Sequence, residues 1–206
     1  MEERFEPART CLLLFDLLEG HVNRDEASRA RFRPVIANAA ALLAAARSAR
    51  AMIAYACADH RADGAGGSRV IRDTDNRLRP IRPGDSDADK PAVVGGTREA
   101  RVVAELAPQP GDYIVPKHRW SAFHGTYFDT ALRSRGANTI VLCGASTDVG
   151  VASTAFAARD LDYNLVIVSD ACTSPEQDNH EQLMRRIFPR MARVRTTAQV
   201  VATLSM

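Results

Sequence analysis

Short, mostly apolar segments alternate along the chain with segments whose apolar residues fall at helical spacing. The short segments, which we predict to be strands, are 10–15, 51–57, 113–115, 139–143, 164–169 and 192–195. Runs that are apolar throughout, such as 10–15, are typical of strands buried on both faces of a parallel sheet. The alternation of strands and helices predicts an α/β fold, with a parallel sheet covered by helices on both faces.

The segments between the strands predict helices that begin and end at recognisable signals. The predicted helices are 34–50, 97–106, 125–134, 147–160, 176–189 and 198–204. Pro34 suits the first turn of its helix, so the charged residues 24–33 before it are expected to form a loop or a solvated helical turn. No repeat or linker divides the chain, and residues 1–206 are predicted to form one domain.

Two segments lack helical or strand periodicity. Residues 1–9 are polar and are expected to form a loosely held tail. Residues 61–96 carry glycines, prolines, aspartates and arginines with little apolar pattern. A segment this long without regular elements is usually a binding loop or lid, so 61–96 is the predicted substrate loop.

Charge and cysteine content narrow the class of protein. The net charge is only +2 and the basic residues are scattered, which gives no indication of nucleic-acid or membrane binding. Cys11, Cys57, Cys143 and Cys172 lie mostly in apolar runs, without Cys-x-x-Cys spacing or a secretory signal. We therefore expect buried thiols and a cytoplasmic location.

Residues 139–160 (TIVLCGASTDVGVASTAFAARD) predict a strand, a sharp turn at Gly144 and a helix. Such a turn directs the N–H groups of a helix N-terminus beyond the strand, where anions bind readily, although many such turns only connect two elements. Gly150 is unexpected, since glycine in a helix costs about 1 kcal/mol relative to alanine. Either another group lies close to the backbone at Gly150, or the side chain that this position would carry has been lost.

Asp16 and Lys117 each follow a predicted buried strand. Because the carboxyl ends of parallel strands meet at one edge of a sheet, both side chains should emerge at the edge where α/β sheets bind ligands. Asp16 could instead cap the following helix, and Lys117 could be a surface residue. A carboxylate after a wholly apolar strand is costly to bury unless it is solvated, paired or functional.

Asp59 and His60 follow the second predicted strand and could begin a metal site, or form a hydrogen-bonded loop pair. No third ligand follows at a recognisable spacing, although His118 and His124 lie further along the chain. We therefore expect no catalytic metal and no cofactor.

Three separately spaced motifs resemble those of the isochorismatase-like, or cysteine hydrolase, superfamily. They are Asp16 after its strand, Lys117 in PKHRWSAFHGT, and GASTDVGVASTAFAARD. The resemblance implies a Rossmann-like, three-layer α/β/α domain with a mostly parallel sheet of about six strands, assembled as a homodimer or homotetramer. It also implies an Asp–Lys–Cys triad, but Gly150 occupies the position of the nucleophilic cysteine, as in true isochorismatases.

Isochorismatases cleave a vinyl ether, which needs protonation rather than attack by a thiolate. The resemblance therefore implies a hydrolase that acts on a small carboxylated metabolite without a covalent cysteine intermediate. Asp16 would be the general acid or base and Lys117 its charge partner, with Gly150 at the vacant nucleophile position. The expected substrate contacts are Arg119, Phe123, Ser146, Thr147 and Val149.

Two departures from the isochorismatase pattern keep other functions open. Ala58 stands where those enzymes have a glutamine, and the turn at 146–148 lacks their aromatic and histidine residues. The flanking sequence resembles the amidase branch more closely. The alternatives are an amidase that uses activated water, or whose cysteine has been replaced, and a catalytically silent domain that binds a small anion or a protein partner.

Overall fold

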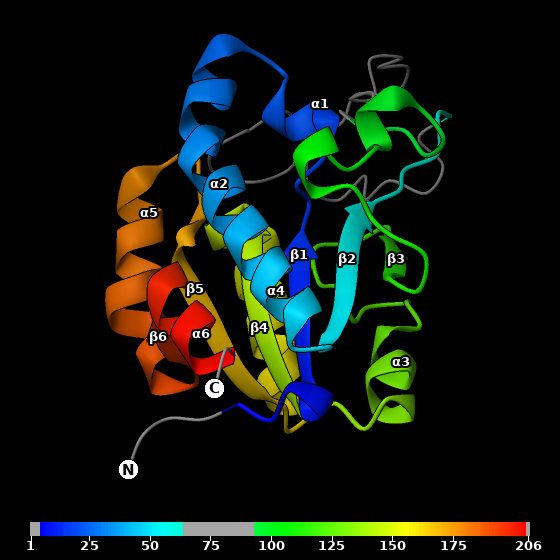
Figure 1. The fold of residues 1–206 in the computed structure, drawn as a ribbon. Helices are drawn as coiled ribbons and strands as arrows, with labels where there is room; N and C mark the ends of the chain where they lie inside the picture. The colour runs from blue at the N-terminus through cyan, green and yellow to red at the C-terminus, as the bar shows by residue number, and fades with distance from the viewer. Residues whose placement is uncertain (1–4, 64–92, 205–206) are drawn as a thin grey trace.

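Six parallel strands form one sheet in the order β3-β2-β1-β4-β5-β6, in a computed structural model that describes residues 5–63 and 93–204 (Figure 1). The strands are β1 (Thr10–Phe15), β2 (Met52–Ala58), β3 (Tyr113–Lys117), β4 (Thr139–Ala145), β5 (Asn164–Thr173) and β6 (Arg193–Arg195). Every strand overlaps its predicted segment, and the predicted α/β fold is confirmed. Most of the predicted substrate loop lies outside the described residues.

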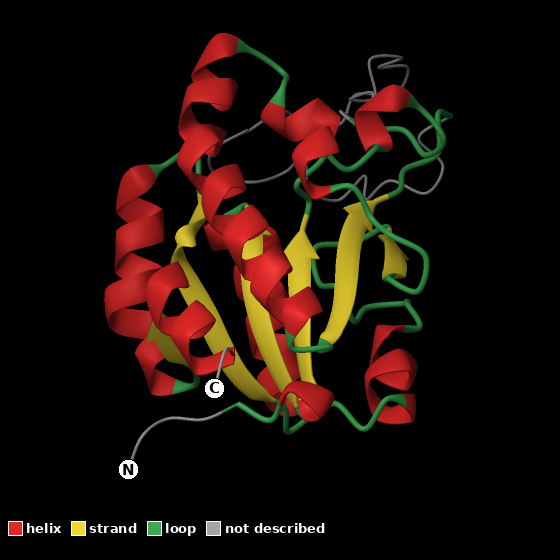
Figure 2. Cartoon of the chain, viewed as in Figure 1, coloured by secondary structure: helices red, strands yellow, loops and turns green. Residues whose placement is uncertain are grey.

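Helices cover both faces of this sheet (Figures 1 and 2). The described α-helices are α1 (Glu19–Val22), α2 (Glu26–Ser48), α3 (Phe128–Ser134), α4 (Ala152–Asp160), α5 (Gln177–Gln182) and α6 (Thr197–Leu204). Helices α2 and α6 pack on each other and on β5, in front of the sheet in Figure 1, whereas α4 lies behind it. The result is the predicted three-layer arrangement.

Helix α2 begins eight residues before its predicted start, at Glu26 rather than Pro34. Asp25 caps it, because its Oδ1 accepts a hydrogen bond from the Ser28 N–H at 2.7 Å. Pro34 therefore lies inside the helix. Of the two alternatives for the charged segment 24–33, the loop is wrong and the helical one is nearer, since most of the segment forms the start of α2. Its many arginines obscured a buried stripe. That stripe is Ser28, Phe32, Val35, Ile36, Ala39, Leu42, Leu43 and Ala46.

The helix predicted over 97–106 is wrong, since the segment forms two short 3₁₀ turns instead. These turns are Arg98–Ala100 and Ala104–Leu106. Val103 and Leu106 are buried, and the Val103 N–H donates to the Leu17 carbonyl at 3.1 Å. The apolar spacing of this segment reflects packing against the chain after β1 rather than a helix.

The N-terminal tail is packed from Phe5 onward, contrary to prediction. The Phe5 ring is buried, and the Arg193 guanidinium lies 5.1 Å from its centroid. A 3₁₀ turn, Pro7–Arg9, then leads into β1. The aromatic side chain supplies enough apolar area to hold this short segment on the fold.

The central strands β1, β2 and β4 are buried along their whole length, as expected for parallel strands between two helix layers. The four cysteines are free and buried, as predicted. Within the described parts of the chain, no helix is long and apolar enough to cross a membrane.

The order of the strands reverses between β1 and β4, which pair in register from Thr10 with Thr139 to Phe15 with Gly144. In parallel α/β sheets, ligands bind beyond the carboxyl ends of the strands at such a switch point. The residues placed there are Asp16, after β1, and Ser146, after β4.

Candidate active site

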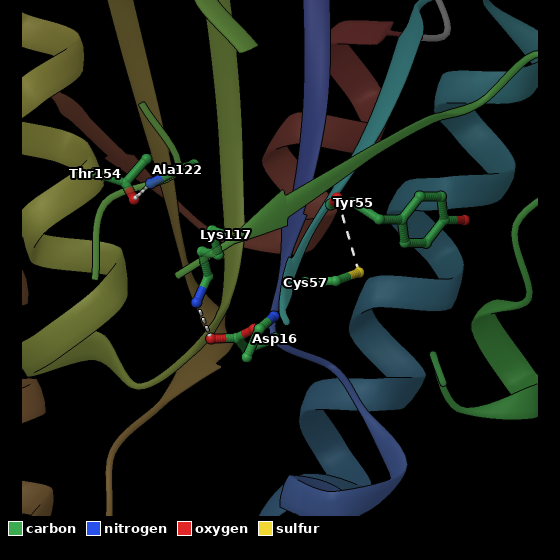
Figure 3. Close-up of polar contacts among 7 residues, drawn as sticks. Asp16, Tyr55, Cys57, Lys117, Ala122 and Thr154 are labelled. Carbon is green, nitrogen blue, oxygen red and sulfur yellow. Dashed lines mark hydrogen bonds and ion pairs between the residues drawn. The ribbon is translucent and has the colours of Figure 1, made fainter. Parts of the chain in front are cut away.

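Asp16 and Lys117 form a buried ion pair at the carboxyl edge of the sheet (Figure 3). The Lys117 Nζ lies 2.6 Å from Asp16 Oδ2, and the Ala58 N–H donates to Asp16 Oδ1 at 2.7 Å. Only 12% of the Asp16 side chain and 5% of the Lys117 side chain is exposed. Both oxygens of the carboxyl group therefore accept hydrogen bonds from groups fixed by β2 and β3.

The backbone also fixes Asp16. Its φ angle is 50°, in the left-handed region, and its N–H donates to the Ala56 carbonyl at 2.9 Å. Aspartate and asparagine enter this region more readily than most residues other than glycine. The turn after β1 thus directs the carboxyl group toward Lys117 rather than into a cap for α1.

Phe15 occupies the space beside Gly150. A Cβ atom built on Gly150 would lie 2.2 Å from Phe15 Cε1 and 2.6 Å from Cζ, far inside van der Waals contact. The Phe15 ring is fully buried, and the Lys117 Nζ lies 4.5 Å from its centroid. Residue 150 therefore has no room for a side chain, because the Phe15 ring from β1 fills that space.

A cavity of about 230 Å³ opens beside these residues. Its lining residues are Asp16, His21, Arg31, Phe32, Lys117, Trp120, Ala145, Ser146, Val149, Gly150, Thr173 and Pro175. The expected convergence of Asp16, Lys117 and Gly150 on one pocket is thus present in the structure. Such a cavity, with charged and polar side chains beside aromatic and aliphatic ones, is typical of a site for a small molecule.

The five expected substrate contacts divide into two groups. Ser146 and Val149 line the cavity. The Phe123 ring instead packs against the rings of Phe128 and Tyr163, at 5.0 and 5.8 Å, and the buried Thr147 hydroxyl contacts His180 Nδ1 at 2.9 Å. Arg119 donates to the carbonyl of His118 and is not among the lining residues. Contact of these last three with a substrate stays a prediction.

Seven lining residues were missed from the sequence: His21, Arg31, Phe32, Trp120, Ala145, Thr173 and Pro175. Arg31 lies four residues before Val35 and three after Ser28, on the buried stripe of α2, and an arginine at that spacing was an available signal. Trp120 is placed by the segment after Lys117, where the Ala122 N–H donates to Thr154 Oγ1 of α4 at 3.0 Å (Figure 3). No sequence signal indicated His21.

Burial lowers the pKa of His21, although the nearby Asp16 carboxylate opposes the shift. The pKa of His60 is lowered for the same reason, and Lys117 lowers it further. Both imidazoles are therefore expected to be neutral at pH 7. They surround the ion pair without adding positive charge to it.

Asp148 holds the turn after β4. Its carboxylate accepts hydrogen bonds from Ser146 Oγ, from Ser174 Oγ at 2.6 Å and from Asn179 Nδ2 at 2.8 Å. Burial raises the pKa of Asp148, but these hydrogen bonds outweigh burial and its pKa is lowered. This network ties the residues that follow β4 to those that follow β5.

The Asp59–His60 pair forms loop contacts. The Asp59 carbonyl contacts His118 Nδ1, and His60 bridges to Val94. Within residues 5–63 and 93–204, no three His, Cys, Asp or Glu side chains are grouped as metal ligands.

A larger hollow of about 610 Å³ lies at the opposite edge of the sheet. It is lined by residues at the starts of the strands, among them Arg9, Thr139 and Asn164. Because Asp16 and Lys117 follow the other ends of their strands, this hollow is separate from the candidate active site.

The carboxyl–ammonium pair thus lies in a small cavity at the carboxyl edge of a parallel sheet, the place where open α/β sheets bind small molecules. The comparisons identify the family of this chain: the isochorismatase domain model matches residues 10–199. The chain belongs to the isochorismatase family and is a hydrolase.

Three similar proteins illustrate the range of the family. The uncharacterized isochorismatase family protein YwoC of Bacillus subtilis is 36% identical over 196 residues, which are 93% of this chain and 92% of that protein. The ureidoacrylate amidohydrolase RutB of Pseudomonas syringae pv. syringae is 32% identical over 179 residues, 82% of this chain and 72% of that one. A cysteine hydrolase structure from Pseudomonas syringae pv. phaseolicola has a TM-score of 0.82 and 25% identity, and covers 99% of this chain and 96% of that one.

Proposed function

We propose that this protein hydrolyses a small carboxylated metabolite with water as the nucleophile and without a covalent enzyme intermediate. The observation that carries the proposal is the position of the Phe15 ring, which fills the space of a side chain at residue 150. The chain's four cysteines are all buried, and burial raises the pKa of each thiol, to about 12 for Cys57 and Cys172. A thiolate nucleophile is therefore not available in this cavity.

Asp16 is the proposed proton-transfer group. In an enol ether, protonated Asp16 would deliver its proton to the vinyl carbon, and water would add to the resulting oxocarbenium carbon and return a proton to Asp16. The hemiketal so formed would then separate into an alcohol and a carbonyl product. Lys117 would be the charge partner of Asp16 in the step in which Asp16 has given up its proton and is a carboxylate.

Protonation of Asp16 depends on the charge of the substrate. In the free protein, the Lys117 Nζ lies 2.6 Å from Asp16 Oδ2. A substrate carboxylate that enters the same cavity brings a second negative charge near Asp16, and like charge favours the protonated form. An anionic substrate would thus prepare its own general acid.

Amide hydrolysis is the second candidate function, and two observations favour it. RutB, whose name describes an amidohydrolase, is 32% identical to this chain. In addition, both oxygens of Asp16 already accept hydrogen bonds, as expected of a carboxylate ready to take a proton from water. Here Asp16 would act as a general base toward water that attacks the amide carbon.

A substrate panel with Asp16 variants tests these proposals. Isochorismate-like enol ethers and small amides would be incubated with the protein and analysed by mass spectrometry. We expect Asp16→Asn to lower kcat by at least about 100-fold with little change in KM. Asp112→Asn is the matched control, because Asp112 also pairs with a cation, Arg47 at 2.7 Å, and is not among the residues lining the cavity.

Deuterium incorporation into the product distinguishes enol ether hydrolysis from amide hydrolysis. Enol ether hydrolysis in heavy water should place one deuterium on the protonated carbon, whereas amide hydrolysis leaves no such label. Near-normal turnover by Asp16→Asn would refute the assigned role of Asp16 in either reaction.

A further inference from the structure

Arg31 brings a positive charge to the candidate active site, and no described residue forms an ion pair with it. It lies on α2 and lines the same cavity as Asp16 and Lys117. Its Nε is buried and has no hydrogen-bond partner among the described residues. The guanidinium lies 5.3 Å from the ring centroid of Phe32, its neighbour in the chain.

A buried guanidinium N–H without an acceptor is unusual, because buried polar groups in native proteins are nearly always satisfied. Packing on Phe32 supports the plane of the guanidinium but accepts no hydrogen bond from it. The group is thus oriented and lacks an acceptor, as expected of a donor whose partner is a ligand.

The charge of the cavity favours an anion. Its charged lining residues are Asp16, Lys117 and Arg31. Asp16 is engaged by Lys117 at 2.6 Å, and the structure shows no carboxylate paired with Arg31 among the described residues. His21 adds no charge while burial keeps it neutral. Within residues 5–63 and 93–204, one positive charge therefore remains without an opposite charge beside the proposed acid.

Apart from the hydroxyl groups of Ser146 and Thr173 and the His21 ring, the rest of the cavity wall is apolar. Phe32, Trp120, Val149 and Pro175 contribute to its walls, and its volume of about 230 Å³ suits a small molecule. A ligand that matches both features has one anionic group and a compact unsaturated or ring body. A phosphorylated or highly charged ligand would leave charge against the apolar walls.

We propose that Arg31 binds the carboxylate of the substrate through Nε and one Nη, and that the substrate is a small monocarboxylate with an apolar body. Arginine suits this role because two parallel N–H groups match the two oxygens of a carboxylate. The proposal rests on the proposed function only in placing the substrate in this cavity.

The fluorescence of Trp120 allows ligand binding in the cavity to be measured without any enzymatic turnover. It is the only tryptophan in the chain, it lines the cavity, and its side chain is half exposed. Benzoate is a suitable probe, with benzamide as its neutral counterpart. Titration of the full-length protein with benzoate should change the Trp120 emission to saturation, whereas benzamide should bind at least about 10-fold more weakly.

Variants of Arg31 then test the contact. Arg31→Gln should weaken benzoate binding by at least about 10-fold and leave benzamide binding unchanged. Arg31→Lys should fall between, since it keeps the charge but loses the paired N–H groups. Arg33→Gln is the matched control, because Arg33 is exposed on the same helix, and it should bind as the wild type.

The outcomes separate this proposal from the proposed function. Benzoate binding that is unchanged in Arg31→Gln, or absent in the wild type, overturns the role of Arg31 whatever Asp16→Asn does to turnover. Arg31-dependent benzoate binding in a protein that hydrolyses no compound of the panel supports the anion site and counts against the hydrolytic proposal. If Arg31→Gln fails to fold, a crystal structure of the wild type with benzoate decides, by whether the carboxylate lies within hydrogen-bond distance of Arg31 Nε.

Discussion

The Phe15 ring occupies the space that a side chain at residue 150 would need. A Cβ atom at residue 150 would lie 2.2 Å from the Phe15 ring, which is fully buried and cannot move into solvent. Gly150 lies in the turn that follows β4, the strand that pairs with β1, although 135 positions separate the two residues in the chain. A change at one of them therefore has to be accommodated by the other.

This relationship predicts strong coupling between substitutions at the two positions. Gly150→Ala should lower the free energy of unfolding by about 1–3 kcal/mol, because overpacking outweighs the gain of up to about 1 kcal/mol in helix propensity. In Phe15→Leu, the two ring atoms nearest the added methyl group are absent. Gly150→Ala should then cost less, which urea unfolding of the four variants of the cycle would measure. Additive effects would show that the ring does not oppose a side chain at residue 150.

Removal of one member of the buried ion pair should destabilise the fold. Lys117→Met leaves the Asp16 carboxylate without its cation and should cost about 3–5 kcal/mol, measured by urea unfolding at pH 7. The double variant Asp16→Asn, Lys117→Met should recover part of this loss. Arg24→Met is the control, because Arg24 pairs with Asp25 at the surface with 60% of its side chain exposed, and it should cost under about 1 kcal/mol. If Lys117→Met and Arg24→Met lower the free energy of unfolding equally, the buried ion pair contributes no more to stability than the exposed one.

The thiols should be inert in the folded protein. Burial raises the pKa of all four cysteines, so iodoacetamide at pH 7.5 should leave activity and intact mass unchanged over hours. The same reagent in concentrated urea should label all four, as a control for its reactivity. Loss of activity with labelling of one cysteine in the native protein would contradict the proposed thiol-independent reaction.

Stability should decrease as the pH falls below about 6.5. Burial lowers the pKa of His21, His60 and His180 in the folded protein from their ordinary value of 6.5. The unfolded chain therefore binds protons first as the pH falls, and each histidine contributes a slope of at most about 1.4 kcal/mol per pH unit between 6.5 and its lowered pKa. His21→Gln should reduce this slope in urea unfolding measured from pH 5 to 8. His124→Gln is the control, since His124 is exposed, and an unchanged slope in His21→Gln would refute the assignment.

The strands were predictable from the sequence because each depends on a local property. Runs such as 10–15 are apolar on both faces, and their short length favours a buried strand over a buried helix. Helix α2 was harder, since arginines in its first turns conceal Phe32, and the Asp25 cap lies outside the apolar pattern. The turns at 98–106 depend on contacts with Leu17, which no local pattern contains.

The site residues that directly follow strands were predictable from the sequence. Those placed by tertiary packing were not. Asp16 and Lys117 meet because parallel strands share an edge. His21, Arg31 and Trp120 reach the cavity from segments whose positions are set by tertiary structure. The role of Phe15 could not be predicted for a further reason. It is the last residue of an apolar strand, and its ring matters only because residue 150 has no side chain.

The ion pair has an asymmetry that follows from the order of the strands. Asp16 follows β1, near the middle of the sheet, whereas Lys117 ends β3, which is an edge strand among the described strands and pairs there with β2 alone. Edge elements open more often than central ones, on a scale that amide hydrogen exchange can measure. Each local opening of β3 would withdraw the cation while leaving the acid and its cavity wall in place. Mild denaturant should therefore abolish turnover before the central strands lose their exchange protection, so that the protein becomes inactive while most of it is still folded.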